Sequence, residues 1–142
     1  MSHRILVIED DIAIMETLVI FLHYEGYQVS KARSVESALE CLDEGRPDLV
    51  LLDYMLQDDT AEAVVEAARA QHPGVPIILL TAAEDSAGKG KMLGVDDVVS
   101  KPFELDVLLR IVRECIGSKT AVVNAASVIE MDVTTSSQRT LQ

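Results

Sequence analysis

The sequence of 142 residues is long enough for one ordinary domain with a short appendage, and its apolar content of 49% can fill a core. The net charge of −12 argues against direct binding of nucleic acid, because phosphate backbones require a basic surface and the longest basic cluster is only Lys89-Gly-Lys91. The N-terminus does not resemble a signal peptide and no apolar run approaches membrane-spanning length, so we expect a soluble, cytoplasmic protein with no membrane partner. The acidity either keeps the surface soluble or gathers carboxylates around a cation.

The first third of the chain alternates short apolar runs with amphipathic stretches. The first apolar run stops abruptly at Glu9, and the helical periodicity that follows it ends at Gly26, a typical C-cap. Ser34 is a suitable N-cap for the next helix. We predict strands over residues 5–8 and 27–32, and helices over residues 12–25 and 35–44.

The middle and later parts of the chain repeat this alternation. The run from Leu49 to Leu52 is apolar at every position, which indicates burial on both faces, as in a parallel sheet. It stops at Asp53, and the next helix is broken by His72-Pro73-Gly74. We predict strands over residues 49–52, 75–80 and 95–100, and helices over residues 60–71 and 105–116.

Repeated strand–helix units with short connections predict an α/β fold with a doubly wound, five-stranded parallel sheet. We expect the flavodoxin-like strand order 2-1-3-4-5, in which the first and third strands are neighbours. In such sheets, ligands bind beyond the C-terminal ends of the strands, where the strand order reverses. The residues that end the strands should therefore determine the function.

The last residues differ in composition from the rest. Residues 117–142 have no net charge, are frequently Ser or Thr, and are too few for a second core. We predict a domain over residues 1–117 and a linker or C-terminal tail over 118–142. A truncated second domain and a segment docked on the first domain remain alternatives, and the strand-like run over 128–133 is compatible with the former.

The two cysteines, Cys41 and Cys115, occupy apolar positions of helix-like stretches. We interpret them as small buried thiols, with a disulfide or a reactive thiol as the alternative.

Polar residues follow four of the predicted strands at their C-terminal ends. These residues are Glu9, Asp10 and Asp11 after the first strand, Asp53 after the third, Thr81 after the fourth and Lys101 after the fifth. Because the first and third strands are neighbours, their carboxylates should lie within a few ångströms of one another, which demands either protonation or a cation.

This set of residues suits phosphoryl transfer. Oxygen-only ligands with access to water are typical of Mg²⁺ sites. Asp53 is a competent phosphoryl acceptor, while Thr81 can donate a hydrogen bond to a phosphoryl oxygen and Lys101 can neutralise its charge. Taken singly, each residue has a simpler interpretation: Asp10 or Asp11 as a helix N-cap, Thr81 as another cap and Lys101 as a solvated lysine. Four matching strand ends in one sheet favour the functional interpretation.

The sequence resembles the receiver domain of bacterial two-component response regulators from residue 4 to about 117. The resemblance is carried by Ile5-Leu-Val-Ile-Glu-Asp-Asp11, Pro47-Asp-Leu-Val-Leu-Leu-Asp53, Pro76-Ile-Ile-Leu-Leu-Thr-Ala82 and Gly94-Val-Asp-Asp-Val-Val-Ser-Lys-Pro-Phe103. Each stretch is moderately specific, and their order and spacing together are highly specific.

The resemblance implies a phosphoprotein that carries an aspartyl phosphate on Asp53. It implies Mg²⁺ as cofactor, with Asp10 as a direct ligand, Glu9 as the second acidic member, and Asp53 and the Met55 backbone carbonyl completing the site. Thr81 and Lys101 would bind the phosphoryl group, small Ala82 would leave access to it, and Pro102 matches the family's cis proline.

The implied partners follow from the same resemblance. They are a sensor histidine kinase or phosphotransfer protein, an output domain or partner protein, and a second copy of the chain in a homodimer. The implied protein is not an enzyme in the usual sense, since it catalyses only its own phosphorylation and dephosphorylation.

The sequence departs from the family's pattern in several places. Gln57 replaces a customary proline, Thr60-Ala61 replaces an Asp-Gly pair, and the segments from Asp53 to Thr81 and from Thr81 to Lys101 are shorter than usual. We therefore expect a loop of different shape after Asp53.

Two departures concern the switch itself. Gly88 and Gly90 interrupt the expected fourth helix over residues 84–93 and cost about 2 kcal/mol relative to alanine, so we predict a short or frayed helix. Val98 occupies the position of the family's mobile Tyr or Phe, so we expect the signal to pass instead through ordering of residues 82–94.

Two other functions remain open at this stage. A receiver-like docking module that works without phosphorylation is favoured by the altered loop and by Val98. A phosphohydrolase acting through an aspartyl phosphate generally carries an acid two residues after the nucleophile, where this sequence has Met55.

Overall fold

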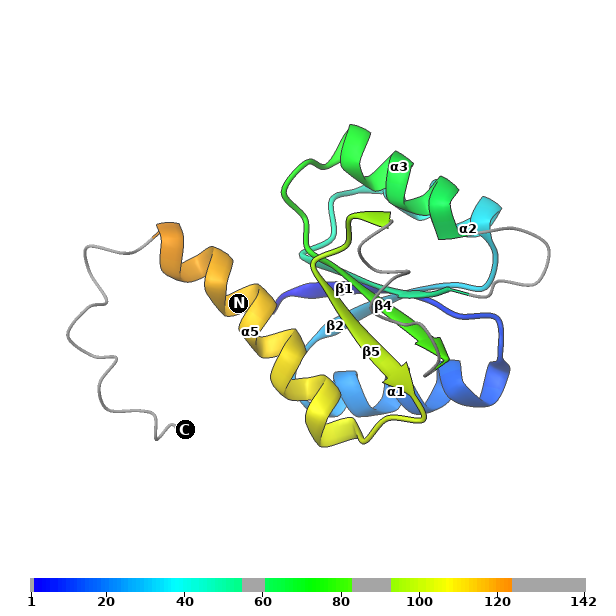
Figure 1. Cartoon of the computed structure of the whole chain (residues 1–142), viewed down its shortest axis with the longest axis vertical. Helices are drawn as coiled ribbons and strands as arrows, with labels where there is room; N and C mark the ends of the chain where they lie inside the picture. Colours follow the sequence, from blue (N-terminus) through cyan, green and yellow to red (C-terminus); the bar gives the residue numbers. More distant parts are fainter. Residues whose placement is uncertain (1, 55–60, 83–92, 124–142) are drawn as a thin grey trace.

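The computed structural model describes residues 2–54, 61–82 and 93–123, which form a parallel sheet with helices on both faces (Figure 1). The strands of this part of the chain are β1 (Arg4–Ile8), β2 (Gln28–Ala32), β3 (Leu49–Asp53), β4 (Ile77–Ala82) and β5 (Asp97–Lys101). Their order is β2-β1-β3-β4-β5, and every neighbouring pair is parallel. The predicted α/β fold and the strand order 2-1-3-4-5 are confirmed.

The helices of the described residues divide between the two faces of this sheet. They are α1 (Ile12–Tyr24), α2 (Val35–Glu44), α3 (Ala61–Gln71) and α5 (Leu105–Val123). Helices α2 and α3 cover one face, and α1 and α5 cover the other (Figure 1). The sheet is therefore the middle layer of three, as crossover connections of a single hand to either side of the switch point require.

Strand β3 shows how one sequence pattern fills both cores. All five of its residues are buried. Because side chains alternate along a strand, Val50 and Leu52 pack into the core under α2 and α3, whereas Leu49 and Leu51 pack into the core under α1 and α5. The continuous apolar run thus indicated burial on both faces correctly.

Capping residues fix where the helices begin. Asp11 is the N-cap of α1, and its Oδ1 accepts a hydrogen bond from the Ile14 amide at 3.0 Å. Ser34 is the N-cap of α2, and its hydroxyl accepts from the Ser37 amide at 3.1 Å. The sequence left open whether Asp10 or Asp11 was the cap, and the structure assigns that role to Asp11.

Helix α5 is longer than predicted. It was expected to end at Ile116, but it continues to Val123, beyond the predicted domain boundary at residue 117. No proline follows Gly117 in this stretch, and a single glycine weakens a helix without ending it. The division into a domain and a tail stays a prediction, although a helix spans the boundary.

Several predictions lie outside the described residues. They concern the loop that contains Met55 and Gln57, almost all of the predicted fourth helix over 84–93, and the strand-like run over 128–133. Within the described residues, no helix is long and apolar enough to cross a membrane.

Both cysteines are free thiols. Cys41 packs at the edge of the core under α2 and α3, and Cys115 at the edge of the core on the opposite face. Burial raises the pKa of Cys115 to about 11 and also raises the pKa of Cys41, so both thiols are protonated at neutral pH. The structure supports unreactive thiols, which are half-buried rather than fully buried.

Candidate functional site

Three carboxylates meet at the C-terminal edge of the sheet. Glu9 directly follows β1 and Asp53 ends β3, and these strands pair side by side with Ile8 opposite Leu52. Oxygens of Glu9, Asp10 and Asp53 all lie within 4.8 Å of one another. We call these three residues the acidic cluster. Their predicted convergence is confirmed, and it follows from the parallel pairing of the first and third strands.

Lys101 supplies a cation to this cluster from across the sheet. It ends β5, and its Nζ lies 3.1 Å from Oδ1 of Asp53 and 3.3 Å from Oε1 of Glu9. Burial lowers the pKa of Lys101, but the hydrogen bond and the charge of Asp53, together with Glu9, outweigh it and leave the pKa raised. The Lys101–Pro102 peptide bond is cis, as the resemblance implied.

The surroundings of Glu9 disfavour its charged form. Its side chain is only 1% exposed, and its Oε2 accepts a hydrogen bond from the Asp11 amide at 3.2 Å. Burial and then the negative charge of Asp53 raise the pKa of Glu9 to about 7, against the opposing effect of Lys101. Burial and the charge of Asp53 therefore disfavour the charged form of Glu9 more than Lys101 favours it.

Thr81 places a hydroxyl at the same edge. It lies in β4, the strand that pairs with β3, and is 1% exposed. Its Oγ1 is buried and has no hydrogen-bond partner among the described residues. A buried hydroxyl without a partner is costly, so this atom is suited to a ligand oxygen that arrives from outside. The neighbouring Ala82 is exposed and small, as expected for an open approach.

The acidic cluster fits a hard divalent cation. Its donors are all carboxylate oxygens, two of its three residues are nearly fully buried, and its negative charge exceeds what Lys101 neutralises. Mg²⁺ prefers such oxygen ligands and is usually held by few carboxylates together with water and phosphate oxygens. Glu9, Asp10 and Asp53 are the described residues that could hold it; Met55, the fourth predicted ligand, lies outside the described residues.

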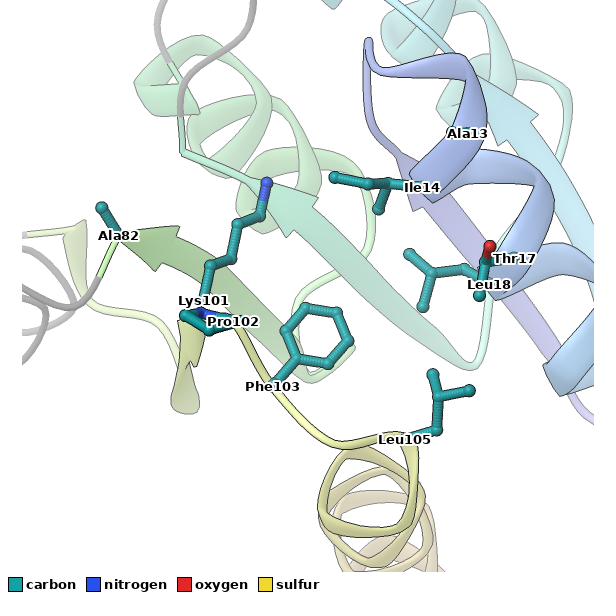
Figure 2. Close-up of a pocket in the computed structure, with 9 residues that line it drawn as sticks. All are labelled: Ala13, Ile14, Thr17, Leu18, Ala82, Lys101, Pro102, Phe103 and Leu105. Carbon is teal, nitrogen blue, oxygen red and sulfur yellow. The ribbon is translucent and has the colours of Figure 1, made fainter.

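An apolar groove adjoins this edge (Figure 2). The groove has a volume of about 550 Å³, and it lies between α1 and the segment that follows β5. Figure 2 shows the Phe103 ring facing the side chains of α1 and the Lys101 side chain extending away from that ring. Lys101 and Ala82 line the groove as well as the polar site, so a ligand at the carboxylates has an apolar surface beside it.

Two contacts of the site were not anticipated from the sequence. Arg33, the first residue after β2, donates from Nη2 to the Asp10 carbonyl at 3.4 Å. The Asp11 amide donates to Glu9, in addition to the role of Asp11 as a cap. Arg33 directly follows the C-terminal end of β2, so it has the same kind of position in the sequence as the predicted site residues. It was missed because the second strand was not included among those ends.

Val98 is half-buried and packs against the core under α2 and α3. The expectation that its small side chain alters the readout of the switch stays a prediction.

Comparison with known proteins agrees with this arrangement. The profile of the family described as the response regulator receiver domain matches residues 5–113. TcrX of Mycobacterium tuberculosis, a probable transcriptional regulatory protein, is 37% identical over 110 residues, which are 75% of this chain and 47% of that protein. MtrA of Mycolicibacterium smegmatis, a DNA-binding response regulator, is 42% identical over 115 residues, covering 80% of this chain and 50% of that protein. The chain spans about half the length of these curated relatives.

Solved structures lead to the same family. The receiver domain of the sensor histidine kinase PA1611 from Pseudomonas aeruginosa has a TM-score of 0.75 and 28% identity, and covers 82% of this chain and 99% of its own. That structure holds a magnesium ion in its active-site cleft. A CheY-like receiver domain protein from Methanospirillum hungatei has a TM-score of 0.78 and 27% identity, covering 84% of this chain and 98% of its own. The fold, the arrangement of strand-end residues and the match over residues 5–113 show that this chain belongs to the response-regulator receiver family.

Proposed function

We propose that this chain is a phosphorylation-controlled switch that accepts a phosphoryl group on Asp53. The family consists of signalling modules of two-component systems rather than enzymes that turn over external substrates. The observation that carries the proposal is the position of Lys101 Nζ, which lies within 3.1 Å of Asp53 and 3.3 Å of Glu9. A lysine so placed neutralises charge on whatever anion joins Asp53.

The proposed reaction is a direct transfer to the carboxylate. An oxygen of Asp53 attacks the phosphorus atom of the phosphodonor and forms an acyl phosphate, while the bond to the leaving group breaks and its electron pair departs with that group. The leaving group is imidazole when the donor is a phosphohistidine, and acetate when it is acetyl phosphate. Dephosphorylation by water returns the carboxylate and inorganic phosphate.

Each residue of the site has a separate part in this proposal. Lys101 pairs with one phosphoryl oxygen, and the Thr81 hydroxyl, which has no partner among the described residues, donates a hydrogen bond to another. Glu9 and Asp10, with Asp53, would hold Mg²⁺, which when bound supplies positive charge to the phosphoryl oxygens. We also propose that Met55 contributes its backbone carbonyl.

The proposed partners follow from the family. A sensor histidine kinase or a phosphotransfer protein supplies the phosphoryl group in the cytoplasm, and the state of Asp53 passes to an output domain or a partner protein. A homodimer of the phosphorylated form is a further proposal. The DNA-binding relatives extend over about twice the length matched here, so an output domain following residue 117 is compatible with them.

Intact mass measurement after incubation with acetyl phosphate and Mg²⁺ tests the switch. We expect one phosphoryl adduct on the wild type and none on Asp53→Asn. Asp48→Asn is the matched control, since it makes the same change at the opposite edge of the sheet, and it should keep the adduct.

The alternative functions give different results in the same experiment. A docking module that needs no phosphorylation would show no adduct even with a kinase. Its supporting observation is α1, which exposes the large apolar side chains Ile12, Ile20 and Tyr24. A phosphohydrolase would release many equivalents of phosphate per chain, against which stands Met55 in place of an acid.

A further inference from the structure

Arg33 ties the end of β2 to the acidic cluster. Ala32, the last residue of β2, pairs with Ile8 and accepts a hydrogen bond from the Glu9 amide at 3.0 Å. The next residue, Arg33, donates from Nη2 to the Asp10 carbonyl at 3.4 Å. A guanidinium is therefore held against the backbone of Asp10, a member of the acidic cluster.

This guanidinium differs from Lys101 in its place and its exposure. Lys101 reaches the cluster from the β5 side and bonds directly to carboxylates, whereas Arg33 lies on the β2 side, bonds to a backbone carbonyl and is exposed to solvent. A guanidinium has several N–H donors, and the bond to the Asp10 carbonyl uses only one of them. The positive charge and the other donors can therefore bind an anion that approaches from water.

The net negative charge of the chain explains why a cation at this position would matter. A phosphodonor is an anion and must approach a protein of net charge −12, toward three gathered carboxylates. An exposed cation beside a member of the cluster lowers that barrier without occupying the site. We propose that Arg33 is a positioning residue that strengthens the binding of doubly charged phosphodonors before transfer to Asp53. This inference rests on the proposed function and adds a determinant of donor preference to it.

The proposal predicts effects of opposite sign on the two charged ligands of the site. Loss of Arg33 should weaken binding of an anionic donor, because an attraction is lost. The same loss should strengthen binding of Mg²⁺, because a repulsion is lost. A variant that merely distorts the segment from Glu9 to Asp11 would weaken both.

The test compares Arg33→Gln with wild type at low and at high ionic strength. Initial rates of phosphorylation are measured against acetyl phosphate concentration at saturating Mg²⁺, and Mg²⁺ binding is measured separately by calorimetry. We expect the KM for acetyl phosphate to rise about threefold to tenfold at low ionic strength, with the maximal rate nearly unchanged and the difference lost at high salt. Mg²⁺ should bind about twofold to fivefold more tightly.

Three controls sharpen this test. Arg33→Lys should restore the wild-type KM, since it keeps the charge. Arg46→Gln removes the same charge from an exposed residue at the opposite edge of the sheet and should change neither quantity. Phosphoramidate, which carries less negative charge than acetyl phosphate, should discriminate less between wild type and Arg33→Gln.

The outcomes separate this inference from the proposed function. An unchanged KM in Arg33→Gln, a salt-independent loss of maximal rate, or weaker Mg²⁺ binding would each overturn the role of Arg33 while phosphorylation of the wild type stands. If the wild type itself takes up no phosphoryl group, the proposed function fails first. Mg²⁺ binding by Arg33→Gln would still show whether this charge acts on the cluster.

Discussion

Polar groups at the two edges of the sheet differ in their burial and in their hydrogen bonding. At the N-terminal edge, Asp96 accepts hydrogen bonds from the Ile77 amide at 2.7 Å and from Arg69 at 3.0 Å. Arg69 also donates to the carbonyls of Val75 and Gly94. At the C-terminal edge, by contrast, Glu9, Asp53 and Thr81 are buried, the pKa of Glu9 is raised to about 7, and the Thr81 hydroxyl has no partner among the described residues.

This difference separates stability from function within one fold. Partly exposed groups with good partners cost little to place, and they stabilise the described segments that immediately precede β4 and β5. A buried carboxyl group whose charged form is disfavoured, such as Glu9, and a buried hydroxyl without a partner among the described residues, such as Thr81, lower stability until a ligand contacts them. Glu9 and Thr81 at the C-terminal edge should therefore oppose stability, and we expect the residues of that edge to affect the proposed phosphorylation, while Arg69 and Asp96 at the N-terminal edge should affect stability alone.

The largest contrast should come from removing one cation at each edge. Lys101→Met should slow phosphorylation about 100-fold, because a preorganised donor to the phosphoryl group is lost. Arg69→Met should leave that rate nearly unchanged and lower the free energy of unfolding by about 1 to 3 kcal/mol, because its carbonyl and carboxylate partners lose a donor. Rates from phosphoryl incorporation and urea unfolding of both variants check this.

A slow reaction in Arg69→Met would break the separation between the edges. So would a Lys101→Met protein that is folded, binds Mg²⁺ as the wild type does and is phosphorylated at the wild-type rate.

Much of this contrast could be predicted from the sequence, because strand ends are visible in it. Continuous apolar runs predict the strands, and the abrupt stops at Glu9 and Asp53 predict the edge at which the acidic cluster lies. Parallel pairing then brings the carboxylates together without any knowledge of side-chain conformation. The sequence could not decide whether Asp10 or Asp11 capped α1, because both residues satisfy the same local pattern.

Other features depend on tertiary distances that no spacing reveals. The sharing of one lysine between Glu9 and Asp53 requires the actual reach of a side chain from β5 across the sheet to β1. The Arg33 contact depends on a side-chain conformation in the connection between β2 and α2. Helix α5 continues past Gly117 because the low helix propensity of one glycine is too small to end a helix that has already formed. These are the contacts for which coordinates are needed.

A matched pair of amide substitutions should change stability in opposite directions. Without divalent cations at pH 8, Glu9→Gln should raise the free energy of unfolding by about 2 kcal/mol, since it removes a buried charge that the fold disfavours. Asp96→Asn should lower it by about 1 kcal/mol, since the charged partner of Arg69 is lost. Chemical unfolding in chelator measures both. If both substitutions changed the free energy of unfolding in the same direction, the buried carboxylate of Glu9 would not be destabilising the fold.

The raised pKa of Glu9 predicts that the free energy of unfolding depends on pH. Between about 4.5 and 7, the folded chain keeps a proton on Glu9 that the unfolded chain has released, so this group's contribution to stability falls as pH rises through that window. The difference in unfolding free energy between Glu9→Gln and wild type should therefore be smallest near pH 4.5 and reach its full size above pH 7. Unfolding curves at several pH values in chelator check this. A difference that does not change with pH would contradict it.

The smallest expected effect belongs to Thr81. Thr81→Val keeps the shape of a buried side chain and removes a hydroxyl without a partner among the described residues, so stability should stay level or rise by about 1 kcal/mol. Thr17→Val, an exposed position on α1, is the matched control and should change stability little. If the hydroxyl is reserved for the phosphoryl group, the Asp53 adduct of Thr81→Val should also respond, with altered formation or lifetime by mass measurement over time. A destabilised Thr81→Val would instead mean that the hydroxyl has a structural partner in the folded chain, which would weaken the case for a ligand oxygen there.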